Sequence, residues 1–301
     1  MKSYRVLITG GTGLLGKTLL ETAPAGWEVF ATYYRNRPPL EWSARFYPLD
    51  VRDEHSISSL FDALRPEVVI HTASIGSVDE AERNPFPVHQ VNVGGTKSIA
   101  GACGRRGAFL VHLSTNAVFD GKNPPYAEES PLVAANRYGA LKIEAEDWVR
   151  RSGAPVLIIR PILMYGWPLP GGRDNVVVRW LTCLEKGETV EVTEAIFSMP
   201  LWAADCAEVI WRALEGKKTG TYHVAGADRI SLATFAKITA RVFSCAERLV
   251  VPVPNSRFSV LAPRPMDTSF VTTKMERELG VRPLGVVAGL TRMQRTRSLV
   301  A

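Results

Sequence analysis

The chain has 301 residues, of which 46% are hydrophobic and 22% charged, a balance typical of globular proteins and not of disordered or low-complexity chains. Lys and Arg exceed Asp and Glu by 36 to 30, and the net charge of +6 suits an anionic small molecule at least as well as a nucleic acid. No apolar run approaches the roughly 18 residues of a membrane helix and no secretory signal is visible, so we expect a cytoplasmic protein without a nucleic-acid or membrane partner.

The first half of the chain alternates short apolar runs with stretches of helical spacing. We expect strands at 5–9, 28–32, 68–71, 109–114 and 156–160, and helices at 14–22, 57–64, 91–103 and 138–151. The strands are apolar throughout, which predicts that both faces of their sheet are covered. Strands that alternate with helices predict right-handed βαβ units, and therefore an α/β fold with a doubly wound parallel sheet.

The first predicted strand runs into a glycine-rich turn, and a helix follows. The turn reads Thr9-Gly10-Gly11-Thr12-Gly13-Leu14-Leu15-Gly16. Its glycines permit a tight turn and let a pyrophosphate approach the backbone, while the helix directs unpaired N–H groups and a positive dipole end at the phosphates. The turn therefore predicts a dinucleotide site, with cofactor contacts at Gly10, Thr12, Gly13, Leu14, Leu15 and Gly16.

The end of the second strand indicates which dinucleotide binds. An NAD site usually has Asp or Glu there for the ribose 2′-hydroxyl, but this chain reads Thr32-Tyr33-Tyr34-Arg35-Asn36-Arg37. A guanidinium matches a phosphate by bidentate hydrogen bonds, so Arg35 and Arg37 favour NADPH over NADH. The alternative is that both arginines are loop charges and the site accepts either cofactor.

Tyr138 and Lys142 lie four residues apart, on one face of a predicted helix. A nearby cation stabilises a phenolate and lowers the pKa of the phenol. Such a tyrosine can give a proton to a carbonyl oxygen as hydride reaches the carbon. The pair is common by itself, but its position after the fourth strand of a chain that begins with the glycine turn makes it specific.

With these motifs, the chain resembles the extended short-chain dehydrogenases/reductases, and most closely the dTDP-4-dehydrorhamnose reductases. The resemblance extends to about Leu290. Further segments that carry it are Asp50-Val51-Arg52-Asp53, Val68-Val69-Ile70-His71-Thr72-Ala73-Ser74, Val91-Asn92-Val93-Gly94-Gly95-Thr96, Leu113-Ser114-Thr115-Asn116-Ala117-Val118-Phe119-Asp120-Gly121 and Arg160-Pro161-Ile162-Leu163-Met164-Tyr165-Gly166.

The resemblance implies roles for the matching residues. Thr115, with Ser114 as the alternative hydroxyl, would hydrogen-bond the substrate carbonyl. Tyr138 would donate the proton, and Lys142 would bind the nicotinamide ribose and tune the tyrosine. The remaining cofactor contacts that the resemblance implies are Asp50, Val51, Thr72, Ala73, Ser74, Asn92 and Pro161.

One segment departs from the pattern of the family. These reductases often read Ser-Thr-Asp-Tyr-Val-Phe-Asp-Gly, where this chain has Asn116 and Ala117 in place of Asp-Tyr. The missing aromatic ring would change a wall of the substrate pocket, so we do not assign the rhamnose precursor as the substrate. The segment also argues against a sugar-nucleotide dehydratase, because neither residue can transfer the proton that elimination requires.

The alternation of strands and helices ends after Pro161. We expect a loop over 162–175, a strand at 221–225 that returns to the main sheet, and helices at 176–186, 231–243 (capped by Ser231) and 272–279. The expected units are a Rossmann domain of 1–162 plus 201–224 and a smaller substrate-binding lobe of 163–200 plus 225–301. Substrate contacts are expected at the carboxyl ends of the strands and in the lobe, at Ser74, Asn116, Tyr165, Trp167, Arg173, Asn175 and Met199.

The function expected is NADPH-dependent reduction of a keto group on a nucleotide-activated sugar, by a monomer or homodimer. A non-catalytic regulatory subunit resembling the methionine adenosyltransferase beta subunit is one alternative, and a sugar-nucleotide epimerase is another.

The cysteines are far apart and indicate neither a disulfide framework nor a metal site: Cys103, Cys183, Cys206 and Cys245. Three histidines in apolar strand patterns are expected in the core: His71, His112 and His223.

Overall fold

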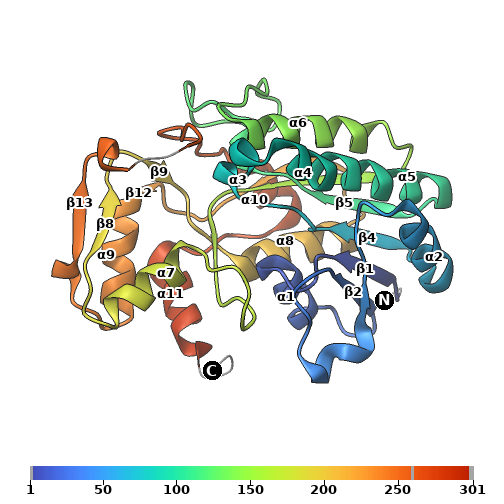
Figure 1. Ribbon diagram of the computed structural model, residues 1–301, viewed down its shortest axis with the longest axis horizontal. Coiled ribbons are helices and arrows are strands. Elements are labelled where there is room, and N and C mark those ends of the chain that lie inside the picture. The colour runs from blue at the N-terminus through green and yellow to red at the C-terminus, as the bar shows by residue number, and fades with distance from the viewer. Residues whose placement is uncertain (1–2, 259–260, 298–301) are drawn as a thin grey trace.

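A computed structural model describes residues 3–258 and 261–297. At its centre is a seven-stranded parallel sheet (Figure 1), with the strand order β11 (Gly220–Val224), β6 (Val156–Pro161), β5 (Phe109–Leu113), β4 (Val68–His71), β1 (Arg5–Thr9), β2 (Glu28–Tyr33) and β3 (Phe46–Pro48). The chain changes its winding direction between β1 and β4, the switch point at which doubly wound sheets open a crevice. The predicted α/β fold and the return of the strand near 221–225 are confirmed.

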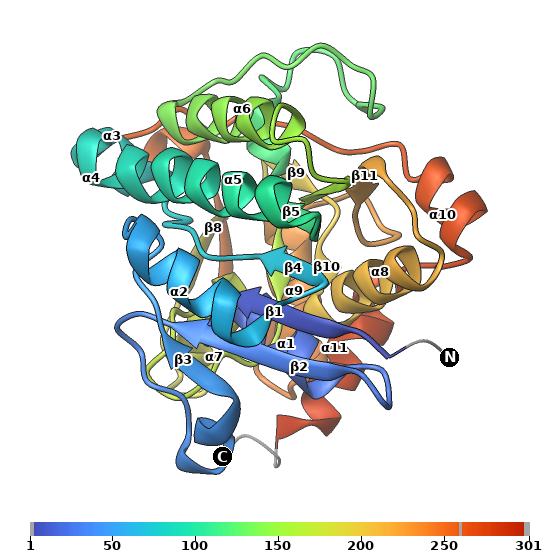
Figure 2. The same cartoon turned by 90° about the vertical axis from the view of Figure 1, so that its right-hand side faces the viewer.

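Helices cover both faces of the sheet, as the apolar strands predict (Figure 2). One face carries α2 (Glu54–Leu64), α5 (Thr96–Arg106) and α6 (Arg137–Arg150), and the other carries α1 (Leu14–Glu21) and α8 (Ala203–Glu215). Successive strand side chains point to opposite faces. Leu7 therefore packs beneath α2 and α5, whereas its neighbours Val6 and Ile8 pack with α1 and α8. His71, His112 and His223 are buried, as predicted.

A second apolar cluster lies beside the sheet, at the left of Figure 1. It joins α7 (Val176–Leu184), α9 (Leu232–Val242) and α11 (Val286–Arg295) to the parallel strand pair β8 (Val190–Thr193) and β13 (Val250–Val253). Ser231 caps α9 by accepting a hydrogen bond from the backbone N–H of Thr234, which confirms that prediction. The division into two units stays a prediction, and residues 259–260 and 298–301 of the expected lobe lie outside the described residues.

Short elements connect these layers. Two small strand pairs are β7 (Met164–Tyr165) with β10 (Leu201–Trp202) and β9 (Phe197–Ser198) with β12 (Ile230–Ser231). Short helices and turns are η1 (Leu40–Arg45), α3 (Val78–Arg83), α4 (Pro85–His89), η3 (Asn116–Val118), η4 (Glu247–Leu249), η5 (Asn255–Arg257) and α10 (Thr273–Leu279). The helix expected at 91–103 runs into a π-helical turn at its start, η2 (Gln90–Gly95), and continues as α5 to Arg106.

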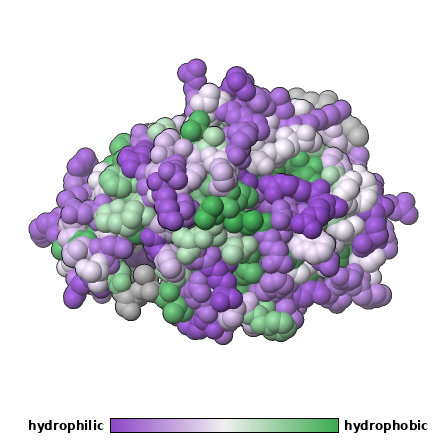
Figure 3. Space-filling view, turned by 90° about the horizontal axis from the view of Figure 1, so that it is seen from above, coloured by the Kyte–Doolittle hydropathy of each residue, from purple (hydrophilic) through white to green (hydrophobic). Residues whose placement is uncertain are grey.

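Within the described ranges, no helix has the length and apolar character needed to cross a membrane. Hydrophilic side chains cover most of the face seen in Figure 3, and apolar ones gather near its middle.

Candidate functional site

The glycine-rich turn lies where β1 ends at the switch point. Gly10 has φ +70°, and a Cβ there would lie 2.8 Å from the Cα of Ala73. A Cβ on Gly16 would overlap the carbonyl oxygen of Gly10, so both positions require glycine. Gly13 precedes α1 without a side-chain cap, and the first turn of that helix holds no acidic residue. The first N–H groups of α1 therefore have no side-chain partner among the described residues. Together with the turn at residues 10–13 they form a site, called the glycine cradle below, that fits a pyrophosphate.

Other residues of the turn are divided between the cradle and the core. Thr12 and Leu14 are partly exposed, and the Leu15 side chain packs into the core beneath them. Leu15 therefore supports the turn from below through packing.

Two arginines follow β2, near the end of the sheet that carries the turn. Arg35 and Arg37 are exposed, and neither forms an ion pair with another described residue. The guanidinium groups of Arg35 and Arg52 lie 5.5 and 5.7 Å from the centroid of the exposed Tyr34 ring. Arg52 also donates a 3.0 Å hydrogen bond to the Tyr34 hydroxyl. No motif in the sequence indicates this contact between Tyr34 and Arg52.

Asp50 and Val51 lie at the same edge of the sheet. Hydrogen bonds from Arg52 to Asp50 hold the pKa of that carboxyl below its ordinary value. Val51 is buried against Gly95, where a Cβ would lie 2.6 Å from Cγ2 of the valine. The contact explains why the chain has glycine in the π-helical turn.

A directed chain of hydrogen bonds lies behind the end of β4. The Thr96 hydroxyl donates to the Asn92 carbonyl at 2.7 Å, so it accepts from His71 Nε2 at 3.1 Å. His71 Nδ1 then accepts from the Thr9 hydroxyl at 2.7 Å, which in turn accepts from the Ala73 N–H at 3.4 Å. Burial lowers the pKa of His71 to about 3, so the ring is neutral, as this tautomer requires.

The loop after β4 is held from two sides. The Thr72 hydroxyl donates to the Thr9 carbonyl at 2.7 Å. Asn92, fully buried in η2, accepts hydrogen bonds from the Ile75 N–H at 2.8 Å and from the Ser74 hydroxyl at 3.1 Å, and donates to the Ile75 carbonyl. These contacts fix Thr72, Ala73 and Ser74 along the edge of the cradle.

Tyr138 meets side chains from three other segments at this edge. Burial raises the pKa of Tyr138 to about 12, and the charge of Arg173 and hydrogen bonds with Thr115 and Ser74 oppose that rise. Ser74 follows β4, Thr115 follows β5, and Arg173 is an exposed residue of the loop before α7. The structure thus places two hydroxyls beside the phenol, and the charge of Arg173 is close enough to act on its pKa.

Lys142 lies one turn further along α6 and is buried. Its ammonium donates a 2.7 Å hydrogen bond to the Leu113 carbonyl at the end of β5. Burial lowers the pKa of Lys142 to about 8, against the opposing charge of Glu146. The cation that lowers the pKa of Tyr138 here is that of Arg173.

The other predicted substrate residues separate into two groups. Asn116 accepts from the Thr115 hydroxyl at 3.3 Å and donates to the Thr268 hydroxyl at 2.6 Å, so it joins the site to the C-terminal part of the chain. Four others are engaged in packing or capping, and their assignment as substrate contacts stays a prediction. Tyr165 is 1% exposed, Met199 is buried, Asn175 caps α7, and Trp167 donates to the Met293 carbonyl at 2.7 Å. Pro161 ends β6 and is also buried.

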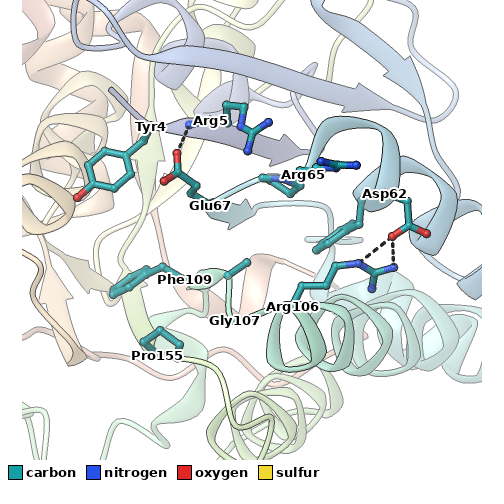
Figure 4. A pocket seen from close by; sticks show the side chains of 12 residues that line it. Tyr4, Arg5, Asp62, Arg65, Glu67, Arg106, Gly107, Phe109 and Pro155 are labelled. Atoms are coloured by element: carbon teal, nitrogen blue, oxygen red, sulfur yellow. Dashed lines mark hydrogen bonds and ion pairs between the residues drawn. The ribbon is translucent and has the colours of Figure 1, made fainter. Parts of the chain in front are cut away.

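A cavity of about 760 Å³ lies at the opposite edge of the sheet, beside the starts of β1, β4 and β5 (Figure 4). Arg5, Arg65 and Arg106 are among the residues that line it, and Arg106 forms an ion pair with Asp62 at 2.7 Å. The cavity is therefore remote from the carboxyl edge, where the cradle and Tyr138 lie.

Comparisons with known proteins agree with this geometry. The chain is 29% identical to a dTDP-4-keto-6-deoxy-D-glucose reductase of Streptomyces niveus, over 93% of this chain and 92% of the relative. It is 28% identical to methionine adenosyltransferase 2 subunit beta of Rattus norvegicus, over 91% and 82%. A crystal structure of dTDP-4-dehydrorhamnose reductase from Bacillus anthracis, in complex with NADP, superposes with a TM-score of 0.86 and 27% identity, covering 97% and 99% of the two chains.

The model of one family, described as the RmlD substrate binding domain, matches residues 4–297, nearly the whole of the chain. The seven-stranded sheet, the glycine turn at its switch point and the Tyr138–Lys142 pair are all in place for the extended short-chain dehydrogenase/reductase fold. The chain accordingly belongs to the RmlD substrate-binding-domain family, with an extended short-chain dehydrogenase/reductase fold.

Proposed function

We propose that the protein is an NADPH-dependent reductase that converts a keto group on a nucleotide-activated sugar into an alcohol. The observation that carries the proposal is the meeting of Tyr138 with Thr115 and Ser74 at the same edge of the sheet as the glycine cradle. The Streptomyces niveus and Bacillus anthracis relatives, both named as reductases of dTDP-linked sugars, support it.

NADPH, when bound, supplies the hydride that adds to the keto carbon. The N–H groups at the start of α1 would hold its pyrophosphate, and Lys142 its nicotinamide ribose. The Tyr138 phenol donates its proton to the keto oxygen, and solvent returns a proton to the phenolate. Thr115 donates a hydrogen bond to the same oxygen. Both contacts strengthen as negative charge develops on that oxygen, and this difference accelerates the reaction.

The electrostatics of the site suit a proton donor. With its pKa raised to about 12, Tyr138 stays protonated at neutral pH. The neighbouring charge of Arg173 stabilises the phenolate that remains after proton transfer. Because Arg173 is exposed at the mouth of the site, we propose that it also pairs with the diphosphate of the substrate.

The test of the function is a screen of keto-sugar nucleotides, dTDP-4-keto-6-deoxyglucose first, for consumption of NADPH. Net oxidation of NADPH with formation of the alcohol is the expected result. Oxidised cofactor that stays bound without net turnover would instead support the epimerase. Absence of turnover with every keto-sugar nucleotide would contradict the proposal.

A non-catalytic partner subunit is the second candidate, because the methionine adenosyltransferase beta subunit of the rat is 28% identical over 280 residues. A stable complex with a partner enzyme, without NADPH consumption, would favour it. For either function we propose a cytoplasmic location and a monomer or homodimer.

We propose that Arg35 and Arg37 bind the 2′-phosphate of NADPH, and their joint replacement by alanine tests this. Each charge-assisted hydrogen bond contributes about 1.5–3 kcal/mol, so loss of one bond from each arginine should raise the Kd for NADPH about 10²- to 10⁴-fold, with little change for NADH. Fluorescence titration measures both affinities. The matched control is Arg179→Ala, which removes an exposed arginine from α7. Equal loss of affinity for both cofactors would contradict the assignment.

We expect kcat/KM to fall as the pH rises above about 8. Protonated Lys142 is the form that binds ribose and stabilises negative charge, and burial lowers its pKa to about 8. Tyr138 remains protonated across that range because its pKa is raised to about 12. A pH profile of kcat/KM checks this, and a flat profile up to pH 10 would contradict it.

A further inference from the structure

The face of α6 that carries Tyr138 and Lys142 continues one turn inward to Glu146, because residues four apart lie on one helical face. The Glu146 side chain is 0% exposed. It accepts hydrogen bonds from Arg160 Nε at 2.9 Å, Arg160 Nη2 at 2.7 Å and Arg150 Nη2 at 2.6 Å, and a further one from the Ser114 hydroxyl. Four donors on two buried carboxylate oxygens fix this side chain in one orientation.

Ser114 connects Glu146 to the candidate catalytic groups. Its neighbour Leu113 offers the carbonyl that accepts from Lys142, and its other neighbour is Thr115, which hydrogen-bonds Tyr138. Ser114 is itself tied to β6 by its N–H, which donates to the Ile159 carbonyl at 2.7 Å. The bond from its hydroxyl to Glu146 therefore holds the end of β5 against α6, where the lysine and tyrosine lie.

Glu146 is also the acid that acts on Lys142. The other titratable groups that face Lys142 from neighbouring elements are His71 on β4 and His112 on β5. Burial lowers the pKa of both histidines far below neutrality, so both are uncharged. The charged groups beyond Glu146 are the cations Arg150 and Arg160. Without the Glu146 carboxylate, the charged groups named here around Lys142 would all be cations.

We propose that Glu146 is a positioning residue with two linked actions: its charge keeps Lys142 protonated, and its hydrogen bond to Ser114 sets the strand end that presents Leu113 and Thr115. The consequence for catalysis rests on the function proposed above. The effect on Lys142 itself is independent of any substrate or cofactor.

Titration of Lys142 by NMR tests the first action on the cofactor-free protein. With ¹³C-labelled lysine, and Lys142→Arg to assign the signal, Glu146→Gln should lower the titration midpoint by about one unit or more. Glu144→Gln is the matched control, because Glu144 is 47% exposed on the same helix and its partner is His89. It should leave the midpoint unchanged, and Glu146→Asp, which keeps the charge, should restore most of it. An unchanged midpoint in Glu146→Gln would overturn this action.

Ser114→Ala tests the second action and keeps every charge, so it remains informative if Glu146→Gln does not fold. We expect kcat to fall about ten- to a hundred-fold, because Glu146 no longer fixes the end of β5 that presents Leu113 and Thr115. A kcat equal to that of the parent would overturn the positioning by Ser114. Tyr138→Phe distinguishes a failure of the proposed function from a failure of the role of Glu146. If Tyr138→Phe keeps full turnover, the proposed function fails, whereas the NMR result for Glu146 is independent of it.

Discussion

Replacement of Tyr138 by phenylalanine is expected to lower kcat for the reduction of a keto-sugar nucleotide by about 10²- to 10⁴-fold. The ring remains and keeps its packing, so the change removes only the proton that the keto oxygen receives. NADPH affinity should change little, because the pyrophosphate is to be held at the glycine turn and the ribose by Lys142. Steady-state rates of NADPH consumption and a separate fluorescence titration measure the two effects.

The control for this variant is Tyr47→Phe, which removes a phenol hydroxyl from β3, outside the cradle and the Tyr138 cluster. It should match the parent in kcat. If Tyr138→Phe were as fast as the parent, another group would have to protonate the product, and the meeting of Thr115, Ser74 and Tyr138 would lose its catalytic meaning. Loss of NADPH binding in step with kcat would point to a packing defect instead.

The sequence predicts the layers of the fold well because local physics dictates them. Fully apolar strands require cover on both faces, and the glycine turn is a set of positions where a Cβ has no room. Two long helices escaped prediction for a physical reason. α8 follows Trp202 and α11 follows Gly285, and neither is capped by a side chain, so the usual signal of a helix start is absent. β3, at three residues, is too short for any periodicity to show.

From the sequence alone, the site can be predicted only where its residues are related by their spacing along one helix or strand. Tyr138 and Lys142 share a helical face, whereas the role of Thr115 beside the tyrosine is implied only by the resemblance to the family. Contacts between segments that are far apart in the sequence produce no recognisable pattern in it. No pattern indicates that the charge of Arg173 acts on Tyr138 or that Arg160 pairs with Glu146. An aromatic residue such as Tyr165 can line a pocket or fill a core, and no pattern in the sequence distinguishes the two; in the folded chain this side chain is buried.

Arg160→Met is expected to lower the free energy of unfolding by about 3–5 kcal/mol at neutral pH. Arg160 is buried, and its guanidinium supplies two of the four hydrogen bonds on Glu146. Removal leaves a carboxylate in the core with part of its charge uncompensated. Urea unfolding measures the loss. Arg212→Met, which breaks the exposed pair with Glu208, should cost under about 1 kcal/mol and serves as control.

The dependence of this stability on pH has a definite sign. Burial alone would raise the pKa of Glu146, but hydrogen bonds and charges from Arg160, Ser114 and Arg150 outweigh it, so the pKa lies below its ordinary value. A carboxyl with a depressed folded-state pKa contributes stability above its unfolded pKa, and the contribution is lost as the pH falls. The parent should therefore lose stability as the pH falls from the ordinary range of glutamate down to the lower folded-state pKa of Glu146, and Arg160→Met should lose less there.

A double variant shows whether the stability lost in Arg160→Met comes from the uncompensated charge of Glu146. If the loss in Arg160→Met comes from an uncompensated Glu146, then Arg160→Met combined with Glu146→Gln should be more stable than Arg160→Met alone, because the neutral amide needs no counter-charge. If the loss comes instead from the contacts of Arg160 with the Glu128 carbonyl and His223, the second substitution should recover nothing. Recovery of stability without recovery of kcat would mean that the fold does not need the charge of Glu146 for its stability. The buried carboxylate would then contribute to the candidate catalytic site.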